Sequence, residues 1–164
     1  MKSEAAIHRI NKMKENNLPI EYVWMDAGWY GADTLPTPDE FEGDWSKHTG
    51  DWMISPLVHP NGLKDVSDAI HDAGMKFLLW VEPERAICTT TMVTEHPDYF
   101  LFDGDENNNN RLLNLGNDDA WNYSFQLLSN LISELNVDCY RQDFNIPPLK
   151  YWQRNDTPGR ALQK

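Results

Sequence analysis

Three short apolar runs alternate with amphipathic segments, and this alternation constrains the possible fold more than any other feature. The runs are "IEYVWMDAGWY" at 20–30, "MKFLLWV" at 75–81 and "VDCYRQDF" at 137–144. They are rich in β-branched and aromatic residues, a pattern typical of parallel strands that are buried on both faces. Apolar residues at helical spacing precede each run, at 3–16, 61–74 and 121–135. The sequence therefore predicts an α/β fold with a parallel sheet and right-handed crossovers.

Two parallel architectures fit this order. A doubly wound nucleotide-binding sheet needs a glycine-rich turn after its first strand, and "DAGWYG" at 26–31 is neither the G-x-G-x-x-G fingerprint nor a phosphate loop. In a (β/α)8 TIM barrel, functional residues lie at the carboxyl ends of the strands. A full barrel needs roughly 200 residues or more. We therefore expect residues 1–164 to form one partial TIM-barrel domain with about three strands, the remaining strands being absent.

Acidic residues directly follow the apolar runs. Asp26, Glu82, Glu84 and Asp143 stand close to aromatic residues in the sequence. Aromatic rings beside acids that bind hydroxyl groups suit a sugar, and hydrolysis of a glycosidic bond needs two carboxyl groups that flank it. An Asp beside an Arg stays ionised. Asp143 is thus a candidate nucleophile that Arg141 orients.

Simpler structural roles explain the same residues when each is taken alone. Arg141 and Asp143 fit an ion pair at a strand end. Asp26 before a glycine fits a turn cap, and Glu82 and Glu84, which flank Pro83, fit partners for Arg85. The functional interpretation is favoured because three acid-bearing strand ends occur in one barrel-like order.

Composition and charge argue against several classes of function. The net charge is −12 and Lys and Arg do not cluster, which excludes nucleic acid as an expected partner. No apolar run reaches the roughly 18 residues of a membrane-spanning helix, so no membrane partner is expected. The His and Cys residues lack the spacing of metal ligands, so no metal site is expected. No signal peptide is recognisable, and the localisation, cytoplasmic or secreted, stays undetermined.

Six segments together resemble the catalytic barrel of glycoside hydrolase family 36, the α-galactosidases or melibiases. They are "IEYVWMDAGWYG", "GDW", "HPNGLKDVSDAIHDAGMKFLLWVEPERA", "HPDYF", "LLNLGN" and "VDCYRQDFN". The resemblance implies a retaining α-galactosidase that hydrolyses terminal α-galactosides, as small molecules or oligosaccharides, through a covalent glycosyl-Asp intermediate without a cofactor. It also implies that the chain holds barrel strands two to four. The acid/base residue then lies outside the chain, and we expect the isolated chain to be inactive.

The resemblance places the functional residues of the family on positions of this chain. Asp143 matches the nucleophile. The substrate-binding positions fall on Asp26, Trp80, Arg111, Arg141 and Asn145. Of these, Asp26 matches the first acid of an Asp-Asp-Gly-Trp motif, and Arg111 is the weaker candidate.

Two departures from the family pattern leave alternatives open. Ala27 stands where the motif has a second Asp, and Arg141-Gln142 replaces Lys-Trp; an Arg fork does not substitute freely for a Lys ammonium. The alternatives are an α-glycosidase for N-acetylgalactosamine or a pentopyranose, a non-catalytic carbohydrate-binding relic, and a TIM-barrel enzyme of unrelated chemistry such as an isomerase. Whether the parent protein is a homo-oligomer also stays open.

Overall fold

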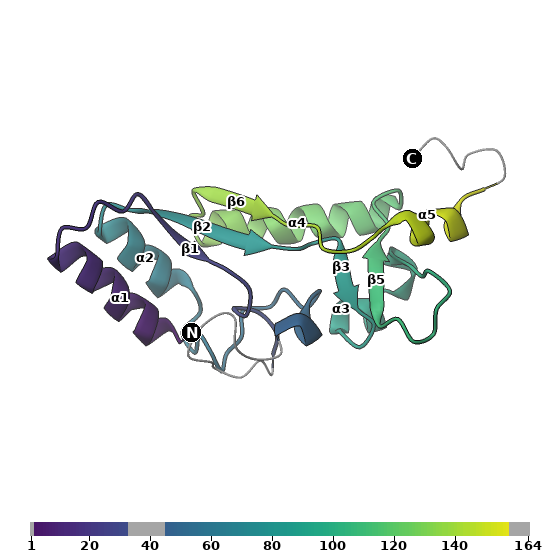
Figure 1. The fold of residues 1–164 in the computed structure, drawn as a ribbon, viewed down its shortest axis with the longest axis horizontal. Coiled ribbons are helices and arrows are strands. Elements are labelled where there is room, and N and C mark those ends of the chain that lie inside the picture. The colour runs from purple at the N-terminus through teal and green to yellow at the C-terminus, as the bar shows by residue number, and fades with distance from the viewer. Residues whose placement is uncertain (1, 33–44, 158–164) are drawn as a thin grey trace.

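The computed structural model describes residues 2–32 and 45–157 (Figure 1). Residues 32–61 are rich in Pro and Gly and show no period, which predicts a long loop, and part of this loop lies outside the described residues. The helices are α1 Ser3–Glu15, η1 Trp45–His48, α2 Lys64–Asp72, α3 Thr91–Glu95, η2 Pro97–Tyr99, α4 Asp118–Glu134 and α5 Leu149–Asn155. The strands are β1 Tyr22–Met25, β2 Lys76–Val81, β3 Arg85–Ile87, β4 Phe100–Leu101, β5 Asn110–Leu113 and β6 Cys139–Gln142.

The predicted parallel sheet is confirmed. Its order is β1-β2-β6, with Met25 opposite Leu79 and Val81 opposite Gln142. Side chains alternate along β2, so Phe77, Leu79 and Val81 are buried on one face. That face packs in one hydrophobic cluster with apolar residues of α1, α2 and α4. The three helices predicted from apolar spacing thus supply the core of the sheet.

The expectation that the strands are buried on both faces is wrong for β1. Tyr22 is 44% exposed and Trp24 is 50% exposed, because β1 is an edge strand of the sheet and these two side chains point away from the helices. The apolar stripe at 121–135 predicts that Trp121 on α4 lies in the core, but Trp121 is 48% exposed and stacks on Phe125. The helical period was right, but the amino-terminal end of α4 continues past the end of the sheet (Figure 1).

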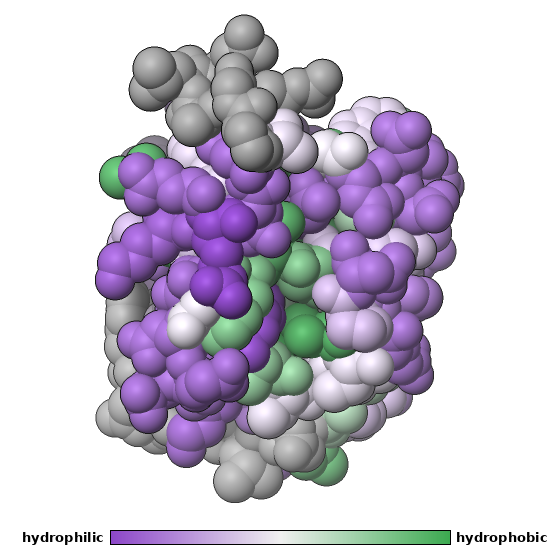
Figure 2. Space-filling view, turned by 90° about the vertical axis from the view of Figure 1, so that its right-hand side faces the viewer, coloured by the Kyte–Doolittle hydropathy of each residue, from purple (hydrophilic) through white to green (hydrophobic). Residues whose placement is uncertain are grey.

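A second sheet was not predicted. Strands β3, β5 and β4 pair antiparallel in that order, at the carboxyl end of β2. Leu112, Ile146 and Tyr151 form a small core that joins this sheet to α5. Figure 2 looks onto this end of the molecule and shows an apolar strip between hydrophilic residues. The short strands carry Asn and Arg and have no clear period, so the sequence pattern did not reveal them.

Local contacts define the helix ends. Asn117 caps α4 by accepting a hydrogen bond from the backbone N–H of Asp119, and Gly74, at φ +74°, follows the end of α2. Ser3 does not cap α1: its hydroxyl lies 2.8 Å from Nδ1 of the buried His59. Burial lowers the pKa of His59 to about 4, so this contact ties α1 to the segment before α2 through a neutral imidazole.

Gly50 provides a test of the packing of the turn after η1 against β3. Its φ is +101°, and a Cβ atom there would stand 2.4 Å from Cβ of Ala86 on β3. We expect Gly50→Ala to lower the free energy of unfolding by more than the about 1–2 kcal/mol that a left-handed conformation costs, because the clash adds to the strain. Urea unfolding measures the difference.

Gly62→Ala is the matched control for this prediction. Gly62 has φ +78° and nothing within 4 Å of the added Cβ, so the substitution tests strain without the clash. Equal losses of stability in the two variants would show that the approach of Gly50 to Ala86 contributes nothing.

Candidate functional site

The parallel register brings the candidate residues to one edge of the sheet. Trp80 on β2 is opposite Arg141 on β6, and the pairing of β1 with β2, continued by one residue beyond Met25, sets Asp26 opposite Trp80. Asp143 follows two residues after Arg141, on the same face of its chain. The register therefore brings the candidate residues at the ends of β1, β2 and β6 to one edge of the sheet, with Trp80 and Arg141 beside Asp143.

Asp143 is held by several donors. The indole N–H of Trp80 donates to its Oδ2 at 3.0 Å, and the backbone N–H of Phe144 donates to Oδ1 at 3.0 Å. The pKa of Asp143 is lowered from its ordinary value. The largest cause is the hydrogen bond from Trp80, followed by a hydrogen bond with the side chain of Asn145, the backbone N–H of Phe144 and the charge of Arg141. The carboxylate is thus ionised at neutral pH and presented at the end of β6.

Arg141 contributes less to Asp143 than the sequence suggested. Its Nη1 lies 3.5 Å from Oδ2 of Asp143, and both side chains are partly open to solvent. The guanidinium lies over the ring of Trp24, 4.6 Å from the centroid, in a cation–π contact. Trp80, which the sequence reasoning did not connect with the carboxylate, is the main partner of Asp143.

Trp80 belongs to an aromatic cluster. It is 2% exposed, and its ring contacts those of Tyr30, Trp45 and Trp52 at centroid distances of 6.0 to 6.2 Å. Its backbone carbonyl accepts the indole N–H of Trp29 at 3.0 Å. These contacts fix the indole in one position, so its N–H is aimed at Asp143 before any ligand binds.

Glu82 lies next to this cluster and was missed as a site residue. Its side chain is fully buried and accepts Nε of Arg85 at 2.8 Å and Nη2 of Arg85 at 2.6 Å. It also accepts the backbone N–H of Asn145 at 2.8 Å. The ion pair with Arg85 is the one the sequence suggested. Glu84, the other acid of that turn, instead accepts from Gln142 at 2.9 Å.

Asp26 and Arg111 lie apart from Asp143. Two strand spacings of about 4.8 Å separate β1 from β6, which puts Asp26 on the order of 10 Å from Asp143. Its Oδ1 accepts the N–H of Ala27 at 2.8 Å, as in the turn-cap interpretation. Arg111, on β5, donates to two backbone carbonyls and lies over the ring of Phe102. Within 2–32 and 45–157, no hydrogen bond or ion pair joins either residue to Asp143.

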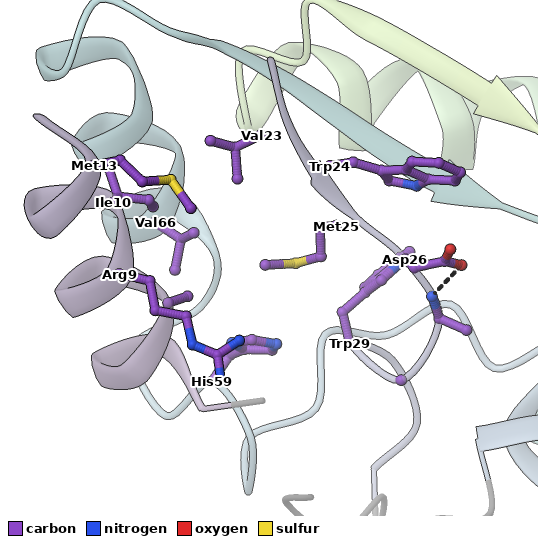
Figure 3. Close-up of a pocket in the computed structure, with 13 residues that line it drawn as sticks. Arg9, Ile10, Met13, Val23, Trp24, Met25, Asp26, Trp29, His59 and Val66 are labelled. Atoms are coloured by element: carbon purple, nitrogen blue, oxygen red, sulfur yellow. Dashed lines mark hydrogen bonds between the residues drawn. The ribbon is translucent and has the colours of Figure 1, made fainter. Parts of the chain in front are cut away.

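A cavity of about 190 Å³ lies elsewhere, between α1 and β1. Figure 3 shows Met25 and Val23 pointing into it from the strand and Arg9 and Ile10 from the helix, while the carboxylate of Asp26 points away from it. The cavity is on the helix side of the sheet, and Asp143 and Trp80 are not among its lining residues. Its position does not support a role in the chemistry of Asp143.

The residues 2–32 and 45–157 also bear on metal binding and on membrane insertion. No group of three or more His, Cys, Asp or Glu side chains is arranged to hold a metal ion there. None of the helices in these ranges has the length and apolar character needed to cross a membrane.

Comparison with known proteins identifies relatives of this chain. The sequence profile of the Melibiase family matches residues 3–154. The α-galactosidase AgaA of Geobacillus stearothermophilus is 28% identical over 132 residues, which cover 78% of this chain and 17% of AgaA. The α-galactosidase Mel36A of Lactobacillus acidophilus is 28% identical over 136 residues, covering 80% and 17%. The chain therefore spans about a fifth of the length of the curated relatives it matches.

Solved structures share the fold. A crystal structure of the α-galactosidase from Lactobacillus brevis has a TM-score of 0.80 at 24% identity and covers 99% of this chain and 21% of its own. A variant of AgaA in complex with raffinose has a TM-score of 0.76 at 24% identity, covering 98% and 21%. The three-stranded parallel sheet and its helices thus align with one part of much longer proteins.

The role of Trp80 predicts a change in the titration of Asp143. Trp80→Phe removes the main donor, and we expect the pKa of Asp143 to rise toward the ordinary value of about 3.9. Because the folded-state pKa is depressed, Asp143 contributes stability above its unfolded pKa that is lost as the pH falls through the folded pKa. The variant therefore loses part of this stability near neutral pH. Carboxyl-carbon NMR across the acidic range measures the pKa directly.

Trp45→Phe serves as the control, because Trp45 meets the edge of Trp80 at 6.0 Å but donates no hydrogen bond to Asp143 within the described part of the chain. An unchanged pKa of Asp143 in Trp80→Phe, or an equal rise in both variants, would contradict the assignment of the indole N–H as the main donor.

Proposed function

The chain belongs to the Melibiase family, the family 36 α-galactosidases, and from this premise we propose that it is a segment of the catalytic barrel of a retaining α-galactosidase. In this proposal β1, β2 and β6 are barrel strands two to four, and the remaining strands come from other parts of a longer protein. The length of the relatives supports this arrangement, since the chain covers 17% of AgaA and 17% of Mel36A.

The observation that carries the proposal is the ionised carboxylate of Asp143 at a strand end. An Asp that attacks an anomeric carbon must be deprotonated and accessible. Hydrogen bonds from Trp80 and Phe144 favour the charged form of Asp143, and about a third of its side chain is exposed. The carboxylate thus combines a lowered pKa with access from the open face of the sheet.

In the proposed mechanism Asp143 displaces the leaving group from the anomeric carbon of the sugar and forms a glycosyl-Asp ester. A second carboxylic acid protonates the leaving oxygen, and its carboxylate then removes a proton from the water that hydrolyses the ester. We place this acid outside the chain, about 5 Å from Asp143 in the assembled barrel. Loss of a general acid typically costs 10²- to 10⁴-fold in rate, so the isolated chain is close to inactive.

We assign substrate binding to the residues around the nucleophile. Asp26 stands on the order of 10 Å away from Asp143, across two strands, which leaves room for one sugar ring between them. Asn145 follows the nucleophile and binds a hydroxyl group beside it. Trp80 acts mainly through Asp143, since its own ring is covered. Arg111 contributes only if a ligand extends toward the second sheet.

The identity of the sugar rests on two positions. Ala27 is 8% exposed and packs in the main core, so it supplies no second acid for hydroxyl binding. Arg141 is engaged with Trp24. These departures favour, as the second candidate, an α-glycosidase for N-acetylgalactosamine or a pentopyranose. A terminal α-galactoside is the first candidate, as AgaA variants have been crystallised in complex with raffinose and with stachyose.

Hydrolysis of an aryl α-galactoside tests this proposal. We expect the full-length protein to be active, Asp143→Ala to lose at least 10³-fold in kcat, and the 164-residue chain to show no measurable turnover. Loss of the nucleophile removes the covalent route altogether, which is why kcat falls. Asp68→Ala, an exposed acid on α2, is the control and retains full activity.

The remaining outcomes separate the alternatives. Activity on an aryl α-N-acetylgalactosaminide or pentopyranoside, with none on the galactoside, would support the second sugar class. Binding of galactose without turnover, and without labelling of Asp143 by an activated fluoro-galactoside, would indicate a carbohydrate-binding relic and contradict the proposal.

A further inference from the structure

Glu82 is the most completely buried charged residue near the site. Its relative exposure is 0%, and that of the Arg85 side chain is 12%. Burying a carboxylate is costly unless it is paired and hydrogen-bonded. Glu82 meets this requirement with three N–H groups, two from Arg85 and one from the backbone of Asn145. The mechanism proposed above gives this buried cluster no task.

The third of these hydrogen bonds reaches the turn that carries Asp143. The backbone N–H of Asp143 donates to the carbonyl of Val81 at 2.9 Å, and the backbone N–H of Asn145 donates to Oε1 of Glu82 at 2.8 Å. The turn is therefore fixed at two points, at Asp143 to the last residue of β2 and at Asn145 to Glu82, the residue that follows β2. Trp80, the residue before Val81, contacts that carboxylate itself.

The other two hydrogen bonds hold the guanidinium of Arg85, a cation that could otherwise bind the carboxylate of Asp143. Arg85 lies close to the turn that carries Asp143, because Oε1 of Glu82 accepts both Nε of Arg85 and the backbone N–H of Asn145, and Glu82 occupies both Nε and Nη2 of Arg85. A guanidinium with a free fork binds a nearby carboxylate in a bidentate pair. Such a pair with Asp143 would compete with Trp80 for the same oxygens and would hold the carboxylate away from a sugar.

We propose that Glu82 is a positioning residue for Asp143: its carboxylate fixes the peptide of Asn145 and keeps the fork of Arg85 away from the nucleophile. The effect of Glu82 on catalysis rests on the function proposed above. Its effect on the position of Asp143 is a property of the folded protein and does not depend on that function. Glu82 touches no reacting atom and acts through the backbone after β6 and through Arg85.

Two variants of the full chain separate the two tasks of Glu82. Glu82→Gln retains an oxygen for the Asn145 N–H but turns an amide NH₂ toward Arg85, which releases one branch of the fork. The double variant Glu82→Ala with Arg85→Ala removes the contact with Asn145 and leaves no unpaired buried charge. Glu84→Gln is the control, because Glu84 lies on the same turn and contacts Gln142 instead.

The readouts are the amide hydrogen exchange of Asn145 and the NMR signal of the Trp80 indole N–H. In the double variant we expect exchange at Asn145 to accelerate at least tenfold while amides of α4 keep their protection. In Glu82→Gln we expect the indole signal to shift toward that of an indole without a charged acceptor, as Arg85 takes Asp143. Glu84→Gln leaves both readouts as in the wild type.

Two results would overturn the proposal. One is wild-type exchange at Asn145 and a wild-type Trp80 signal in both Glu82 variants. The other is equal acceleration of exchange at Asn145 and throughout α4, because that result assigns Glu82 to global stability. Neither measurement uses a sugar. If the galactosidase proposal fails, hydrolysis and labelling show it, while hydrogen exchange and the Trp80 signal still change as expected. In an active full-length enzyme, Glu82→Gln lowers kcat at least tenfold with KM within twofold.

Discussion

The parallel alignment of β1, β2 and β6 is the constraint on which the rest of the site depends. It brings three strand ends to one edge, so residues far apart in the sequence become neighbours without any contact specific to a ligand. The alignment is stable because Phe77, Leu79 and Val81 of the central strand are buried against three helices. Burial of that face fixes the register, since a shift by one residue would turn these side chains out of the core.

Two side chains at the end of β2 position Asp143 in different ways. Trp80 and Glu82 are two residues apart and therefore lie on one face of the chain. The first contacts the carboxylate of Asp143 and the second contacts the backbone that follows it. Because both contacts come from the buried end of the central strand and the residue after it, the candidate nucleophile that follows the edge strand β6 is positioned by side chains held in the interior.

Much of this fold was predictable from the sequence, and the exceptions have physical causes. Apolar period and length identified the three strands and the helices before them, because these elements bury a continuous face. The second sheet was missed because its strands of two to four residues carry no period. The exposure of Trp24 and Trp121 depends on which elements lie opposite them in the fold. A local sequence pattern carries no information about those elements. Asp143 could be singled out from its neighbours, whereas its bond to Trp80 required the register of β2 against β6.

The partner of Asp143 has a consequence for its reactivity. A tight ion pair lowers the pKa of a carboxylate but also binds the electron pairs needed for attack, and Arg141 is kept from such a pair by its stacking on Trp24, at 3.5 Å from Oδ2. The neutral indole N–H of Trp80 favours the ionised form through one hydrogen bond and adds no net positive charge. The position of Arg141 over Trp24 therefore fits a site in which an aromatic neighbour holds the cation. The lowered pKa of Asp143 then owes most to a hydrogen bond from a buried, neutral donor and least to the charge of Arg141.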